Sequence, residues 1–274
     1  MMSEGIETLG ISLNQQSSFL FGHDKQISFL LDRLRTSQIP NAWLFHGPMG
    51  IGKSSLALNI GKVLSNIDFS KKDQIVSISE QDIRSPKTTV NISNVFYCQR
   101  KWDNKKKLFQ KYISIEDIRE LNRKFSLSST DNSYKVCVVD TTEDLNISAA
   151  NSLLKILEEP PKNTLFILVS NNQQSILPTI LSRCQKVGFQ RLNEKNLRDI
   201  YASLIKENEV EQIIDADAVA ACDGSVRKLL NFLDKDYIKI FNSMKTILLD
   251  LPKLNKRKAI TLLSGNKEYL SSDD

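Results

Sequence analysis

Residues Gly47–Ser54 have the types and the spacing of a loop that binds phosphate groups. Their sequence, GPMGIGKS, matches the pattern G-x-x-x-x-G-K-[ST]. Its glycines let backbone N–H groups curl around an anion, and the helix that follows contributes the positive end of its dipole. In this pattern Lys53 reaches the β and γ phosphates, and the Ser54 hydroxyl binds Mg²⁺. The expected nucleotide-binding residues of the loop are Gly47, Gly50, Gly52, Lys53, Ser54 and Ser55.

The alternative is a chance match, which chains of this size produce on the order of once in a hundred. This loop, however, follows a short apolar run and precedes a segment with helical spacing, which is the setting that the motif requires. We therefore expect the chain to bind ATP or ADP together with Mg²⁺.

Asp140 is the second candidate for this site. It ends the apolar run Lys135–Asp140, and P-loop proteins place a Mg²⁺-coordinating carboxylate at the end of such a strand. The next residue is Thr141, whose hydroxyl cannot act as a general base near neutral pH. Glu143 and Asp144 lie beyond the strand, and we expect their side chains to point elsewhere. The sequence thus predicts a site that binds nucleotide and hydrolyses it poorly.

The elements that must position these residues follow the order of an α/β domain. Short apolar runs have the length of buried parallel strands, and the first of them ends at a Gly-Pro turn. The expected strands are Ala42–His46, Lys135–Asp140 and Thr164–Ser170, and the expected helices are Phe29–Arg35, Ser54–Leu64, Ile113–Phe125 and Ile147–Glu159. Together they predict a P-loop domain with a parallel sheet over residues 1–189.

Two stretches of this domain are less regular. Ser65–Asn94 is polar and is expected to be loop with marginal structure. Arg100–Lys111 (RKWDNKKKLFQK) is a basic run that contains Trp102 and Phe109. Such a run can contact DNA phosphates, with the tryptophan against sugar or base, or it can be a solvated insertion. The formal net charge of +5 mildly favours a polyanionic partner, but ordinary surface lysines also account for it.

Beyond Leu192 the expected strands stop and helical patterns follow. Three segments have helical spacing and are expected to form a small lid domain over residues 190–235. They are Leu192–Lys206, Val210–Cys222 and Ser225–Leu233. Residues 236–274 hold the helix-like Tyr237–Leu251 and the basic Lys253–Lys258. This remainder is too short for an independent domain, so we expect a short helical tail.

The composition excludes several other classes of protein. Hydrophobic residues make up 41% and charged residues 25% of the 274 residues, as in a soluble globular protein with a core. The four cysteines are dispersed without a CxxC pair, and His23 and His46 lack metal-ligand spacing, so we expect neither disulfides nor zinc. The first residues lack the pattern of a signal peptide, and the strongest apolar run, Leu165–Val169, is too short to cross a bilayer. We therefore expect a cytoplasmic protein with no membrane partner.

Two longer stretches resemble a known family. Asn146–Pro161 (NISAANSLLKILEEPP) and Leu177–Cys184 (LPTILSRC) are similar to the corresponding stretches of the bacterial clamp-loader subunits of DNA polymerase III, which are AAA+ proteins. Phe21-Gly22-His23 is similar to the segment that lies near the adenine in this family, and Gly224–Arg227 (GSVR) is similar to its lid motif. The resemblance covers most of the chain and implies an AAA+ domain followed by a helical lid.

The resemblance also implies roles for single residues. Arg183 corresponds to an arginine finger, which reaches the γ-phosphate held by a neighbouring subunit; the alternative is a surface arginine that caps a loop. Arg227 corresponds to an arginine that senses the nucleotide, and the alternative is an exposed position on its helix. Ser170 and Asn171 occupy the place of a polar sensor of the γ-phosphate.

Within the family the resemblance separates two roles. The gamma/tau motor subunits have an Asp-Glu pair after the strand and a four-cysteine zinc module, whereas this chain has Asp140-Thr141 and dispersed cysteines. These departures resemble the delta-prime subunit, the stator of the loader, although the best-known delta-prime proteins have lost the phosphate loop. The family's C-terminal collar domain is also longer than the residues that follow Leu233 here.

A delta-prime-like stator implies gamma/tau and delta subunits as partners, an indirect action on the sliding clamp, and primed DNA as a further contact. The first alternative is an active motor ATPase of the gamma/tau type, which Thr141 disfavours. The second is an unrelated P-loop kinase, which the LEEPP and SRC stretches disfavour.

Overall fold

The computed structural model describes residues 20–36, 38–86, 94–126, 133–208 and 214–249. They fall into two compact units, with the boundary between Leu192 and Asn193. The first unit is an α/β domain and the second is helical, which confirms the fold class expected from the sequence.

A five-stranded parallel sheet forms the centre of the first unit. Its strands lie in the order β2-β5-β6-β1-β7, so β1 is flanked by β6 and β7 and the chain crosses over between neighbours. The bounds are β1 Ala42–His46, β2 Val95–Cys98, β5 Lys135–Val139, β6 Thr164–Ser170 and β7 Gln185–Gly188. The carboxyl ends of parallel strands share one edge of a sheet, and ligands of such sheets bind there. Gly47, Asp140 and Asn171, which follow β1, β5 and β6, therefore come together.

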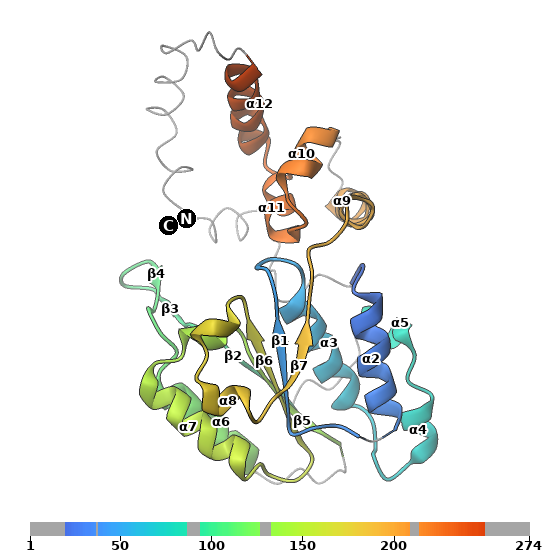
Figure 1. Ribbon diagram of the computed structural model, residues 1–274, viewed down its shortest axis with the longest axis vertical. Coiled ribbons are helices and arrows are strands. Elements are labelled where there is room, and N and C mark those ends of the chain that lie inside the picture. Colours follow the sequence, from blue (N-terminus) through green and yellow to red (C-terminus); the bar gives the residue numbers. More distant parts are fainter. Residues whose placement is uncertain (1–19, 37, 87–93, 127–132, 209–213, 250–274) are drawn as a thin grey trace. The chain divides into compact units, whose positions relative to one another are not determined.

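Helices cover both faces of this sheet (Figure 1). One face carries α2 Asp24–Arg35, α3 Lys53–Leu64, α4 Lys72–Val76 and α5 Glu80–Arg84, and the other carries α6 Ile115–Ser126, α7 Ile147–Glu158 and α8 Pro178–Leu181. Alternate residues of β1 serve the two cores: Trp43 and Phe45 belong to the first, and Ala42 and Leu44 to the second. The strands are buried on both sides, which explains why they read as continuous apolar runs.

The helical unit consists, in its described part, of α9 Glu194–Asn208, α10 Ala216–Ala221, α11 Val226–Asn231 and α12 Lys235–Leu249. Leu197, Val219 and Leu229 are buried between α9, α10 and α11. The Phe232 ring meets the rings of Tyr237 and Phe241 edge-on, at 5.0 Å between centroids in each case, and so joins α12 to this core. The expected Lys253–Lys258 lies outside the described residues.

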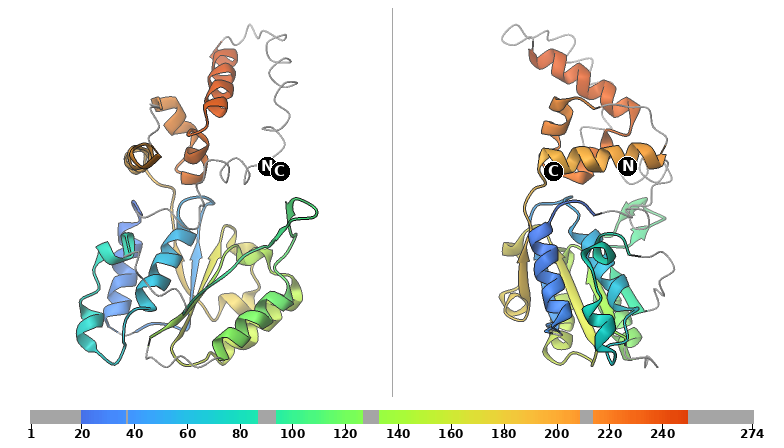
Figure 2. Two further views of the ribbon diagram at one scale, coloured as in Figure 1. Left: turned by 180° about the vertical axis from the view of Figure 1, so that it is seen from behind. Right: turned by 90° about the vertical axis from the view of Figure 1, so that its right-hand side faces the viewer.

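Several elements differ from the sequence expectation. The polar Ser65–Asn94 contains α4 and α5, and Ile75, Ile78 and Ile83 are buried beneath them. Two strands, β2 and β7, were not expected; both lie at the edges of the sheet and have few fully buried residues. The basic run folds into a hairpin of β3 Trp102–Asp103 and β4 Leu108–Phe109, seen from two further directions in Figure 2.

No helix among the described ranges combines the length and the apolar character that crossing a membrane requires.

Candidate nucleotide-binding site

The phosphate loop connects β1 to α3, and two of its positions, Gly47 and Gly52, require glycine. Gly47 has φ +148°, and a Cβ atom there would lie 2.3 Å from the carbonyl oxygen of Phe189, which follows β7. Gly52 has φ +97° and is the N-cap of α3, so the chain turns into the helix through a left-handed residue. The loop is thus held against the end of β7, and α3 points its N-terminus at the loop.

Lys53 is the first residue of α3, and its side chain folds back over the loop. It is only 3% exposed, and its ammonium donates to Gly47 O at 2.8 Å, Pro48 O at 2.6 Å and Asn171 Oδ1 at 3.0 Å. These bonds use all three donors of the ammonium group. Burial lowers the pKa of Lys53 to about 8, against the opposing effect of the Asp140 and Glu143 carboxylates. A bound phosphate group would take the place of Asn171 Oδ1 and give the Lys53 ammonium a negatively charged partner.

Asp140 lies beside Ser54 and is held from two sides. Its Oδ1 accepts a hydrogen bond of 2.7 Å from the Ser54 hydroxyl, and its Oδ2 accepts one from the Tyr97 hydroxyl. The backbone N–H of Asp140 donates to Cys98 O at 2.8 Å. A hydroxyl and a carboxylate in contact are the oxygen donors that Mg²⁺ prefers. The residues present therefore fit the Mg²⁺ expected from the sequence, and Ser54 and Asp140 would hold it. Tyr97 was not foreseen, because no local pattern links β2 to Asp140.

The turn after Asp140 corrects one expectation. Thr141 adopts φ 61° and ψ 71°, a left-handed conformation that is costly for a β-branched residue. The chain therefore turns sharply into a 3-10 helix over Thr142–Asp144. Glu143 Oε1 accepts a hydrogen bond of 2.8 Å from the backbone N–H of Asn171, whose side chain contacts Lys53. The prediction that Glu143 points elsewhere is wrong. Asn171 contacts both the Glu143 carboxylate and the Lys53 ammonium, so Glu143 lies beside the phosphate loop.

Two buried polar atoms of this region have no hydrogen-bond partner among the described residues, namely Glu143 Oε2 and Ser170 Oγ. Buried polar groups in folded proteins nearly always have a partner, so such atoms mark a place where a ligand or water belongs. Ser170 and Asn171, the expected sensor positions, lie at the end of β6 beside the phosphate loop. Ser55 lies on the first turn of α3, directly after Ser54.

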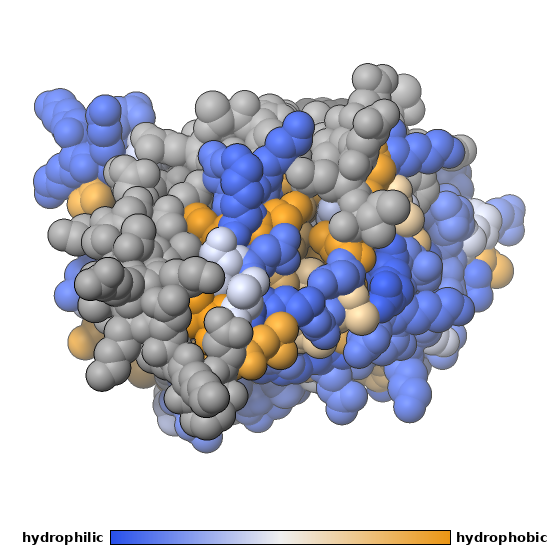
Figure 3. Space-filling model, turned by 90° about the horizontal axis from the view of Figure 1, so that it is seen from above, coloured by the Kyte–Doolittle hydropathy of each residue, from blue (hydrophilic) through white to orange (hydrophobic). Residues whose placement is uncertain are grey.

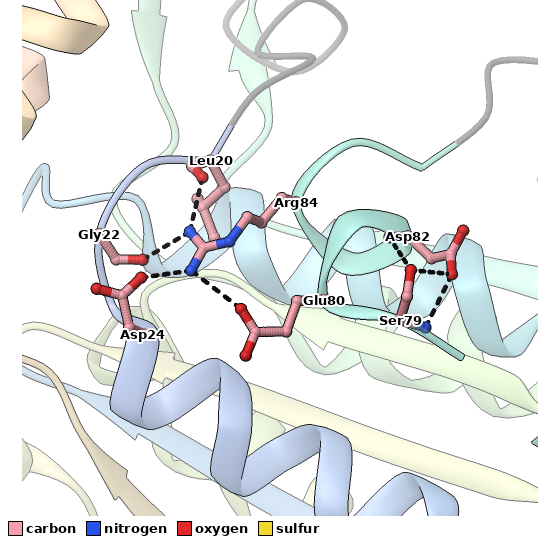
Figure 4. A network of polar contacts seen from close by, with 7 residues as sticks. All are labelled: Leu20, Gly22, Asp24, Ser79, Glu80, Asp82 and Arg84. Atoms are coloured by element: carbon pink, nitrogen blue, oxygen red, sulfur yellow. Dashed lines mark hydrogen bonds and ion pairs between the residues drawn. The ribbon is translucent and has the colours of Figure 1, made fainter. Parts of the chain in front are cut away.

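A third group of contacts holds the segment Leu20–Asp24 in place (Figure 4). The Arg84 guanidinium, at the end of α5, donates to Leu20 O at 3.1 Å and Gly22 O at 3.0 Å and pairs with Asp24. His23 has φ 58° and is buried, and its Nε2 lies 2.7 Å from Ile51 O in the phosphate loop. Burial lowers the pKa of His23, so the imidazole is neutral near pH 7. The segment expected near the adenine is therefore bonded to the phosphate loop.

Arg183 follows α8 and is tethered at the surface. Its Nη2 lies 2.7 Å from Glu158 Oε1, at the end of α7, and its Nη1 donates to Thr179 O at 2.9 Å. The side chain is 36% exposed. The two stretches that carry the family resemblance are thus joined by this ion pair. Arg227 lies near the start of α11 in the helical unit, and its role stays a prediction.

The cysteines give no metal site among the described residues. All four are free, three of them are buried, and no group of three His, Cys, Asp or Glu side chains there is arranged to hold an ion. Burial raises the pKa of the Cys98 thiol to about 12.

One family of known proteins matches this site and its surroundings. The family described as "DNA polymerase III, delta subunit" matches residues 22–193, a range that includes the phosphate loop, Asp140 and Arg183.

Two curated relatives from Bacillus subtilis (strain 168) are similar to the chain. DNA polymerase III subunit tau is 28% identical over 223 residues, which are 81% of this chain and 38% of the relative. DNA polymerase III subunit delta' is 28% identical over 173 residues, which are 63% of this chain and 49% of the relative. The chain therefore spans less than half the length of either relative, and the identities do not separate the two subunit types.

The fold is shared with a solved structure of the Thermotoga maritima RuvB Holliday junction branch migration motor. The TM-score is 0.50 at 14% identity, and the match covers 89% of this chain and 70% of that chain. At this identity the similarity concerns the fold alone, and it agrees with the AAA+ domain expected from the sequence. Because the family match extends over more than half of the residues, the chain belongs to the delta-subunit family of DNA polymerase III.

Proposed function

We propose that the chain is a clamp-loader subunit of the delta-prime type, which binds nucleotide and supplies Arg183 to a neighbouring motor subunit. The observation that carries this proposal is that the phosphate site is assembled but the residue directly after Asp140 is not a carboxylate. Lys53 lies over the phosphate loop and Ser54 is bonded to Asp140, whereas the position after Asp140 is Thr141. Such a site favours binding over turnover.

At the phosphate site each residue would contribute one interaction. Lys53 would exchange its bond to Asn171 for the β and γ phosphates, and Ser54 and Asp140 would hold Mg²⁺. Bound Mg²⁺ would supply neutralisation of phosphate charge. The contact between His23 and Ile51 O connects the segment Leu20–Asp24 to this loop, so bound nucleotide would stabilise both together.

The proposed partners are the gamma/tau motor and delta subunits, with the sliding clamp reached indirectly and primed DNA as a further contact, all in the cytoplasm. Family membership and the two relatives support this assignment. The pair Arg183–Glu158 is half-exposed, so the guanidinium can exchange a surface carboxylate for a phosphate at little cost.

The alternative is an active motor ATPase of the gamma/tau type. Glu143 is the observation that favours it, since its carboxylate lies next to Asn171 and keeps one oxygen without a partner among the described residues. Phosphate release by the purified chain decides between the two. The delta-prime proposal expects negligible turnover, and robust turnover that Lys53→Ala abolishes would establish the motor instead.

Reconstitution of the loader with Arg183→Ala tests the main proposal. The variant should fold and assemble, but the neighbouring ATP site should lose its finger, a contribution of about 10³–10⁵ in rate where such fingers have been measured. Clamp- and DNA-stimulated ATPase and clamp loading should therefore fall. Arg183→Lys should restore little, because an ammonium cannot reproduce the planar two-pronged contact.

Glu158→Gln is the matched control, since it breaks the same ion pair and leaves the guanidinium in place. It should keep the activity of the wild-type loader. If the assembled Arg183→Ala loader hydrolyses ATP and loads clamps at the wild-type rate, Arg183 is not a finger.

A further inference from the structure

Positive charge is concentrated in one short segment of the chain, residues 100–112. The segment has six basic residues and one acidic residue, whereas the chain has 37 basic and 32 acidic residues in all. Removing the segment from that balance leaves 31 residues of each sign. This segment of 13 residues thus carries a net charge of +5, as large as that of the whole chain.

This segment forms the β3–β4 hairpin, which follows the edge strand β2 and projects from the first unit (Figures 1 and 2). Figure 3 shows the molecule from above, with a hydrophilic projection at its left edge, the side on which Figure 1 places the hairpin. A hairpin of two-residue strands is not stable by itself in water. Its order must come from contacts at its base and between its strands.

Those contacts are present. Trp102 and Phe109 face each other across the strands, with ring centroids 5.0 Å apart and planes at 77°. Asp103 Oδ1 accepts hydrogen bonds from the backbone N–H groups of Lys105 and Lys106 and so closes the turn. These contacts order the backbone of the hairpin, whose turn carries exposed lysines at Lys105, Lys106 and Lys107.

Two ion pairs fasten the base of the hairpin. Arg100 Nε lies 2.9 Å from Asp144 Oδ2, and Lys101 Nζ lies 2.6 Å from Asp117 Oδ1 in α6. Asp144 belongs to the same 3-10 turn as Glu143, so the hairpin is connected to the edge of the candidate nucleotide site. These pairs use two of the six basic residues.

The other four basic residues indicate what kind of partner the hairpin contacts. Within the described ranges no carboxylate lies at ion-pair distance from Lys105, Lys106, Lys107 or Lys111, and all four are exposed. Beside them Leu108 is 60%, Phe109 44% and Tyr112 46% exposed. Closely spaced lysines without counter-ions, next to exposed aromatic rings, complement a chain of phosphates whose bases offer flat faces for stacking.

We propose that the β3–β4 hairpin is a contact site for the phosphate backbone of nucleic acid. The inference deepens the proposed clamp-loader role, in which DNA is a partner, and it requires neither the arginine finger nor bound nucleotide. Lys105, Lys106, Lys107 and Lys111 contact phosphates, and Phe109 and Tyr112 lie against sugar or base.

The test measures binding of the full chain to labelled single-stranded and duplex DNA by fluorescence anisotropy between 25 and ~200 mM salt, a range in which phosphate contacts dominate. The triple variant Lys105→Gln, Lys106→Gln, Lys107→Gln should reduce the slope of log affinity against log salt by about 2–3 for duplex DNA, and weaken binding at 0.1 M salt at least about tenfold. The matched control replaces three exposed lysines outside the hairpin, Lys25, Lys72 and Lys162, with Gln and should change the slope much less.

Tryptophan fluorescence locates the contact independently. The chain has two tryptophans, of which Trp43 is fully buried in the first core, so a change on DNA binding reports on Trp102. We expect quenching in the wild type and none in Trp102→Phe.

Equal losses in the triple variant and the control would overturn the proposal, as would absence of DNA binding at 25 mM salt. If the triple variant bound DNA normally but no longer assembled with the other loader subunits, the hairpin would be a protein-docking element instead. In each of these cases nucleotide binding and the effect of Arg183→Ala are measured separately. The clamp-loader proposal is therefore tested independently of the hairpin proposal.

Discussion

Tyr97→Phe removes one oxygen atom and tests how Asp140 is positioned. The Tyr97 hydroxyl donates to Asp140 Oδ2, and burial together with the Asp140 charge raises its pKa, so the group stays protonated and donating. The Tyr97 ring packs against the first core, and phenylalanine keeps that packing. If Ser54 turned from Asp140 to a bound Mg²⁺, the Tyr97 hydroxyl would remain as a side-chain donor to the carboxylate among the described residues.

The expected magnitude follows from this second contact. A hydrogen bond to a charged group contributes about 1.5–3 kcal/mol, and the half-buried position of Asp140 favours the lower end because water can partly replace the lost donor. Partners of metal ligands typically contribute 10- to 100-fold in metal affinity. We therefore expect Tyr97→Phe to weaken Mg²⁺-dependent ATP binding about 10-fold or more, and to leave binding without Mg²⁺ nearly unchanged.

Calorimetry of ATP binding with Mg²⁺ and with EDTA measures both quantities. Tyr134→Phe is the control, because Tyr134 precedes β5 at the end opposite Asp140 and its ring contacts Phe69. Equal affinities of Tyr97→Phe and the wild type for Mg²⁺–ATP would refute the reasoning. A loss of the same size with and without Mg²⁺ would point to a general structural defect.

Three further outcomes follow from the titrating groups and the cysteines. The pKa of about 8 for Lys53 predicts that ATP affinity falls as the pH rises from 7 to 9 and that ATP binding at pH 8.5 takes up protons. Calorimetry in buffers of different ionisation enthalpy measures this proton uptake, and its absence in the wild type would contradict the prediction. The lowered pKa of His23 favours the neutral imidazole in the fold, so stability is complete above the unfolded pKa near 6.5 and is lost as the pH falls below it. The thermal midpoint should decline from pH 7 to 5, and less steeply in His23→Asn, since asparagine tolerates the left-handed backbone. Elemental analysis should find no stoichiometric zinc, and one zinc per chain would show an arrangement of the dispersed cysteines that the sequence does not indicate.

The sequence predicts best where the local pattern and the tertiary role coincide. Strand β1 has the bounds expected for Ala42–His46, because a buried central strand is an apolar run and Gly47 must end it. The edge strands β2 and β7 were missed because their residues are mostly half-exposed and have no such run. Helix α5 was missed because only Ile83 in it is fully buried.

The sequence predicts those residues of the candidate site that belong to one continuous motif, the phosphate loop Gly47–Ser54. Contacts between distant segments were not predictable: Tyr97 reaches Asp140 across 43 positions, and Arg84 reaches Leu20 across 64. The orientation of Glu143 depends on the left-handed backbone of Thr141, a conformation that residue preferences argue against. Such strained positions occur at functional sites, where the surrounding structure enforces them.

Assembly with the other loader subunits tests the central claim most directly. The full chain would be mixed with the gamma/tau and delta subunits of the same organism and separated by size-exclusion chromatography with light scattering. The account predicts one complex that contains this chain in a fixed stoichiometry and that persists in Arg183→Ala. A chain that elutes alone, whatever the nucleotide present, would contradict the assignment as a clamp-loader subunit.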